Sequence, residues 1–134
     1  MSLRTKIILV TVLFALPAFL TGKIIWPPDP MGAVPTSSQL PFFIILSLME
    51  AIVFGLGISF ILFGYPIVKK LSKKDDTLTS LAFLAIAWSM ISWWPHDNMH
   101  IHNGMNLEGL LVIEYTFHFT LMMSSLILAL YFWR

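Results

Sequence analysis

The chain has 134 residues, of which 57% are hydrophobic and 11% are charged, and its mean hydropathy is +0.83. A soluble domain carries about 25% charged residues, so this composition excludes a water-soluble fold of this size and indicates an integral membrane protein. The formal net charge of +1 gives no basis for nucleic-acid binding. The absence of cysteine excludes disulfides, thiolate metal sites, iron–sulfur clusters and covalently attached c-type haem.

Four apolar stretches are long enough to cross a bilayer, at about residues 7–25, 42–68, 78–94 and 107–133. The first follows Arg4 and Lys6, as the core of a secretory signal peptide would, but the FLTGK near its end is a poor cleavage site. We therefore expect a retained first span. The proline-rich residues 26–41 are expected to form a loop. The sequence thus predicts an all-α integral membrane protein whose residues 1–134 form a single domain of four transmembrane helices.

The basic residues predict the orientation of these helices. Lys23 is the only lysine or arginine near the end of the spans where the histidines lie. The other basic residues lie at the opposite end: Arg4, Lys6, Lys69, Lys70, Lys73, Lys74 and Arg134. Because short cytoplasmic segments are enriched in lysine and arginine, both termini are expected to be cytoplasmic. The loop between the third and fourth helices is then extracytoplasmic. We expect a multi-pass protein of the cell membrane.

All four histidines of the chain lie within residues 96–118, in or near that extracytoplasmic loop. Glu114 and His118 are four residues apart on the fourth helix and therefore share a face. Glu50 lies at a similar depth on the second helix. Ionisable groups inside a membrane are costly unless they face a polar interior, so a four-helix bundle would gather them in its outer half. The candidate metal ligands are His96, His100, His102, Asp97, Glu50, Glu114 and His118.

Imidazole and carboxylate groups are ligands for copper, zinc or iron, and an extracytoplasmic site without thiols favours copper. Met99 and Met105 are further ligands that copper accepts. Pro95 and Gly104 argue against a long helix here, so the segment is expected to be a histidine-rich loop. The alternative interpretation is a solvated polar cap, with Glu114 and His118 paired only to satisfy buried groups. A haem would require His96 and His118 as its pair of ligands, and a carboxylate-bridged di-iron site would require Glu-x-x-His, which the chain lacks.

A face of small residues on the second helix predicts close helix packing. Ser47, Ala51, Gly55 and Ser59 recur every four residues. We interpret this face, together with the two outer loops, as a docking surface for other membrane subunits. Membrane lipids are the other expected partners.

For function, we expect a small accessory subunit of a larger membrane oxidoreductase complex, of the copper-dependent monooxygenase or oxidase type. Its outer cluster would bind or deliver a metal, and the chain alone is not expected to be catalytic. One alternative is a purely structural membrane subunit with buried polar pairs. Another is a self-contained membrane enzyme or proton-coupled transporter that works through Glu50, Glu114 and His118.

Overall fold

The computed structural model describes residues 1–32 and 34–133, which are mainly helical and contain no strand. Four helical units are long and apolar enough to cross a membrane: Leu3–Ile25, Leu40–Phe63, Asp76–Asn103 and Leu107–Trp133. The predicted all-helical fold, with four helices of this length and composition, is thereby confirmed. The first unit is the helix α1 (Leu3–Ile25) and the second is α2 (Leu40–Phe63). The other two units are each made of shorter pieces.

The third unit is divided at Ser92 into α4 (Asp76–Ile91) and α5 (Trp93–Asn103). Pro95 has no N–H to donate to the carbonyl of Ile91, so the regular hydrogen bonding of α4 stops there. The helix then resumes, because a proline in the first turn of α5 loses no bond that the helix would otherwise have. The histidine segment is therefore helical, in contrast to the predicted loop, and Gly104 (φ 57°) ends it.

The fourth unit contains a π-helical turn. It runs from α6 (Leu107–Ile113) through η1 (Glu114–Phe119) to α7 (Thr120–Trp133). A π-helix is bonded from residue i to i+5 and has more residues in each turn than an α-helix. Such turns inside α-helices are rare and often occur at functional sites. This one contains two of the predicted ligands, Glu114 and His118.

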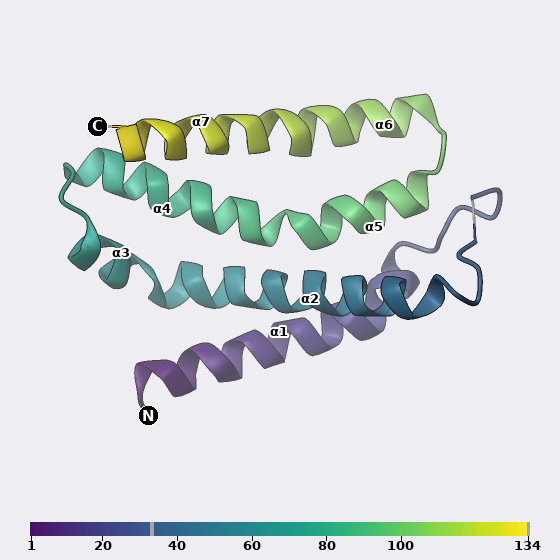
Figure 1. The fold of residues 1–134 in the computed structure, drawn as a ribbon, viewed down its shortest axis with the longest axis horizontal. Coiled ribbons are helices and arrows are strands. Elements are labelled where there is room, and N and C mark those ends of the chain that lie inside the picture. Colours follow the sequence, from purple (N-terminus) through teal and green to yellow (C-terminus); the bar gives the residue numbers. More distant parts are fainter. Residues whose placement is uncertain (33, 134) are drawn as a thin grey trace.

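The four spans pack in the order in which they occur in the sequence (Figure 1). The main contacts are of α1 with α2, of α2 with α4 and α5, and of α4 with α7. The first and fourth spans thus lie on opposite sides of the two central ones. The start of α1 and the end of α7 lie at one end of the molecule, and α5 lies at the other end (Figure 1). This arrangement is a row of helices in which one face of α5 meets the fourth span.

The small-residue face of α2 packs against α1 within the chain. Ala51, Gly55 and Ser59 are all buried, and the Ser59 and Thr11 hydroxyls lie 3.2 Å apart. A Cβ atom at Gly55 would overlap the carbonyl oxygen of Thr11. This face was predicted to dock a partner subunit, but α1 already occupies it, because helices in lipid associate wherever small side chains let backbones approach.

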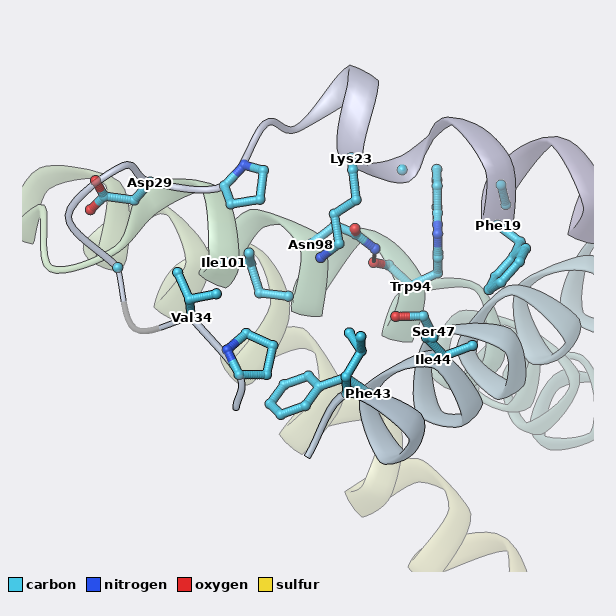
Figure 2. A pocket seen from close by; sticks show the side chains of 16 residues that line it. Phe19, Lys23, Asp29, Val34, Phe43, Ile44, Ser47, Trp94, Asn98 and Ile101 are labelled. Carbon is cyan, nitrogen blue, oxygen red and sulfur yellow. Dashed lines mark hydrogen bonds between the residues drawn. The ribbon is translucent and has the colours of Figure 1, made fainter. Parts of the chain in front are cut away.

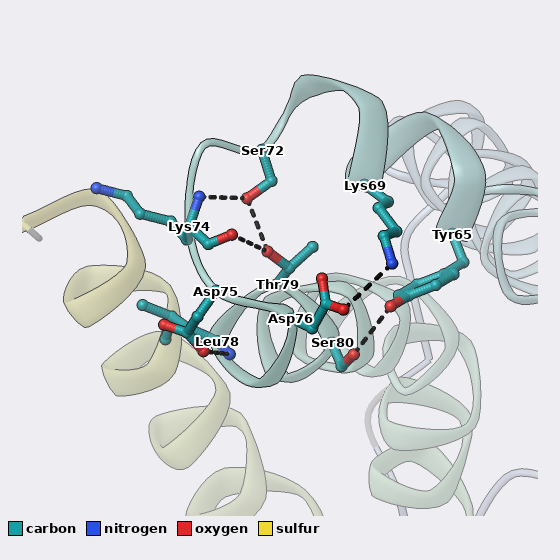
Figure 3. Close-up of polar contacts among 9 residues, drawn as sticks. All are labelled: Tyr65, Lys69, Ser72, Lys74, Asp75, Asp76, Leu78, Thr79 and Ser80. Carbon is teal, nitrogen blue, oxygen red and sulfur yellow. Dashed lines mark hydrogen bonds and ion pairs between the residues drawn. The ribbon is translucent and has the colours of Figure 1, made fainter.

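The short helix α3 (Tyr65–Leu71) follows α2 at the basic end of the molecule. The second span was predicted to continue to residue 68, but α2 ends at Phe63. Polar contacts tie α3 and the turn after it to the start of α4 (Figure 3). Lys69 forms an ion pair with Asp76 at 3.2 Å, and the Tyr65 and Ser80 hydroxyls lie 3.2 Å apart. The lysine-rich segment that links α3 to α4 is thus held against the start of α4.

Candidate metal centre

Three of the four histidines converge between α5 and the π-helical turn. His96, His100 and His118 each offer a ring nitrogen, and these three atoms all lie within 4.8 Å of one another. His96 and His100 lie one turn apart on α5, with ring centroids 4.6 Å apart. His118 approaches from η1, and its Nε2 atom is 2.8 Å from Nε2 of His96. All three side chains are partly buried.

His96 and His118, the two histidines in closest contact, each have a carboxylate at the other ring nitrogen. Nδ1 of His96 lies 2.7 Å from Oδ1 of Asp97, and Nδ1 of His118 lies 2.7 Å from Oε2 of Glu114. An ionised carboxylate can only accept a hydrogen bond, so each Nδ1 is the protonated donor. In the neutral ring this leaves a lone pair on Nε2. With both rings neutral, two lone pairs would therefore face each other between His96 and His118.

Two facing lone pairs 2.8 Å apart repel unless a cation or a shared proton lies between them. Metal-binding histidines usually have this same arrangement, in which the second ring nitrogen donates to a carboxylate that fixes the tautomer and the ring orientation. Two imidazole nitrogens on a tetrahedral ion, each at about 2.0 Å, are separated by about 3.3 Å. A small opening of the His96–His118 pair would therefore admit an ion.

Asp97 is itself held in place by α5 and α2. Its Oδ2 accepts a hydrogen bond from Nε1 of Trp93 at 3.1 Å, so both of its oxygens have partners. The carboxyl group of Glu50, only 5% exposed on α2, lies close enough to interact with Asp97 and feels the charge of Lys23. Glu50 was predicted among the ligands, but it lies next to Asp97 and is not one of the groups that converge at the three histidines.

His102 lies apart from the triad. Its Nδ1 is 2.7 Å from the carbonyl oxygen of Pro27, and the backbone N–H of Asp29 donates to the carbonyl of Ile101 at 3.1 Å. These two bonds fasten the proline-rich segment to the last turn of α5. Met105 follows the end of α5 and its side chain is 85% exposed. His102 was predicted as a ligand, and the structure places it outside the triad.

Aromatic side chains enclose the buried side of the triad. The ring centroids of Phe117 and His96 are 5.5 Å apart, and Phe117 also stacks on Trp88 with a centroid distance of 6.2 Å. Trp88 in turn donates from Nε1 to the Thr120 hydroxyl at 2.9 Å, which joins α4 to α7. Sequence reasoning did not single out these supports, nor the bond from Trp93 to Asp97. The i, i+4 spacing of Trp93 and Asp97 was the available signal, and it applies only if the segment is helical.

The outer side of the site is open. The side chains of Glu114 and His118 are 53% and 39% exposed. The arrangement can hold a cation on three imidazoles and leaves one tetrahedral position free for water, a substrate or a ligand from another chain.

No family model matches the chain, and no curated protein or solved structure shows significant similarity to it.

Proposed function

We propose that the chain binds one transition-metal ion through His96, His100 and His118. The observation that carries this proposal is the approach of two Nε2 atoms, each in a ring whose Nδ1 faces a carboxylate. Asp97 and Glu114 do not bind the metal but orient the two rings and increase their basicity. Copper is the favoured ion, because an all-imidazole set suits copper and zinc and copper forms the stronger complexes with nitrogen ligands.

We further propose that this site serves a larger membrane oxidoreductase, with the chain as an accessory subunit. Support comes from the open coordination position and the half-exposed Glu114 and His118 side chains, which a neighbouring chain or a delivered metal could approach. Helix α5, which carries His96 and His100, also lies away from the lysine-rich segment between α3 and α4 (Figure 1). The positive-inside rule then makes this the extracytoplasmic end.

Metal content tests the first proposal. The full chain is purified in detergent, loaded with Cu(I), Cu(II) or Zn(II), and passed through a desalting column before elemental analysis. We expect one ion per chain in the wild type and only background levels in His96→Ala and His118→Ala. His102→Ala is the matched control, because it removes an imidazole from the same helix but outside the triad, and it should keep the ion. Equal metal content in all four proteins would refute the site.

A separate experiment tests the subunit role. Membranes of the source cells are solubilised in a mild detergent and resolved by native electrophoresis, and the chain is located with an antibody. Comigration with a copper-dependent oxidase or monooxygenase activity supports an accessory subunit. Migration as a homogeneous small particle with bound metal would favour a self-contained protein. Migration in a complex without metal would favour the purely structural role.

A further inference from the structure

A cavity of about 400 Å³ lies on the other side of α5 from the histidine triad. It is bounded by α1, α2, α5 and the proline-rich segment that follows α1 (Figure 2). Trp94, Asn98 and Ile101 form the α5 wall, and they follow one another at helical spacing of four and three residues. His96 and His100 project to the other side of the same helix. The volume is within the range of pockets that bind small molecules, about 300–1,000 Å³.

Most of the cavity wall is apolar, and it carries a few polar groups. Phe19, Phe43 and Ile44 supply apolar surface from α1 and α2. Asn98 is only 6% exposed, and its Nδ2 donates to the carbonyl of Trp94 at 2.8 Å. Among the described residues, no hydrogen bond reaches the Oδ1 atom of Asn98. Because this oxygen is still accessible, a ligand in the cavity with a hydroxyl or N–H group could donate a hydrogen bond to it.

Lys23 gives the cavity a positive charge. It extends from the last turn of α1 toward Asn98 (Figure 2). No ion pair within the described parts of the chain includes Lys23. The other charged residue of the wall is Asp29, which lies away from Lys23 at the far edge of the view and accepts a hydrogen bond from the backbone N–H of Met31. The two charges are thus separated along the cavity.

We propose that this cavity binds an anionic membrane amphiphile. Its acidic oxygens, of a phosphate or a carboxylate, would pair with the Lys23 ammonium, and a head-group hydroxyl would donate to Oδ1 of Asn98. The apolar tail would lie along Phe19, Phe43 and Ile44. A lysine at the end of a membrane helix suits this role, because its long apolar stem lies along the helix while the charged group reaches the interface.

Native mass spectrometry of the full chain in detergent tests the proposal. The lipid probes are a phosphatidylglycerol, a phosphatidylcholine with the same acyl chains, and oleate. We expect one tightly bound phosphatidylglycerol, with at least tenfold weaker retention of the phosphatidylcholine. Strong retention of oleate would identify a carboxylate as sufficient, whereas retention of phosphatidylglycerol alone would identify the phosphate head group.

Three variants make the test specific to the cavity. Lys23→Gln should abolish the preference for the anionic lipid, and Ser47→Leu, which places bulk on the cavity wall, should lower retention of both phospholipids. Lys73→Gln removes the same charge from the basic loop at the other end and should bind as the wild type does. The proposal fails if phosphatidylcholine binds equally well, or if Lys73→Gln weakens binding as much as Lys23→Gln. Metal content is measured in parallel and should not change in any of them.

Discussion

Trp93 and Asp97 lie one turn apart on α5 and are joined by a hydrogen bond of 3.1 Å from the indole N–H to the carboxylate. The other oxygen of Asp97 faces Nδ1 of His96. Asp97 therefore has both oxygens fixed by donors, and it holds the His96 ring with Nε2 directed at His118. The geometry of the proposed centre depends on this carboxylate as much as on the imidazoles.

Asp97→Asn should weaken metal binding by about 10–100-fold, the usual effect of losing a carboxylate that orients a metal-bound histidine. An asparagine has one acceptor oxygen and one donor nitrogen, so it cannot accept from both Trp93 and His96. A competition titration against a chelator of known affinity measures the change. Trp93→Phe keeps the carboxylate and should have a smaller effect in the same direction. Wild-type affinity in Asp97→Asn would contradict the orienting role.

Glu114→Gln is expected to reduce metal affinity, and Glu108→Gln is not. Both changes remove one negative charge from the fourth span, but only Glu114 contacts a histidine, at 2.7 Å. Glutamine can still accept from Nδ1 of His118, so we expect a reduction near the lower end of the range for supporting residues, about tenfold. The same competition titration measures it. Equal effects of the two variants would indicate a general electrostatic influence in place of a specific contact.

Gly55→Leu should separate α1 from α2. A side chain at this position meets the backbone of α1 around Thr11 and Ala15, which cannot give way as a flexible side chain can. Overpacking of this kind costs about 1–3 kcal/mol or more. The readout is a lower thermal unfolding midpoint in detergent. The control is Leu46→Phe, which adds bulk at an exposed position of the same helix and should leave the midpoint unchanged.

Ser92→Ala should leave stability unchanged or increase it. The Ser92 side chain is fully buried where α4 meets α5, and within the described residues its hydroxyl has no hydrogen-bond partner. Removing an unsatisfied hydroxyl relieves a penalty of about 1–3 kcal/mol. Ser89→Ala is the comparison, because that hydroxyl donates to the carbonyl of Ala85 at 2.9 Å. Thermal unfolding of both variants is measured. A large destabilisation of Ser92→Ala would show that the hydroxyl has a partner in the membrane.

The amino-acid sequence by itself determined the four spans and the depth of their polar groups. Both follow from transfer free energy, which depends on the local composition of each segment: an apolar stretch enters the bilayer, and ionisable groups within it are costly unless they meet polar partners. The clustering of histidines near one end of the molecule was equally visible, because it requires only the order of the spans. The cytoplasmic placement of the termini stays a prediction from the basic residues.

The tertiary structure alone decided which of these groups meet. The spans are apolar on most of their surface, so the sequence carries little periodicity that would fix the rotation of each helix. Packing set that rotation: α1 covers Gly55, and the fourth span presents His118 to α5. Two local departures complete the site, the restart of the helix after Ser92 and the π-helical turn at Glu114. Both interrupt regular α-helical hydrogen bonding, and Pro95 and Gly104 had indicated a loop for the histidine segment.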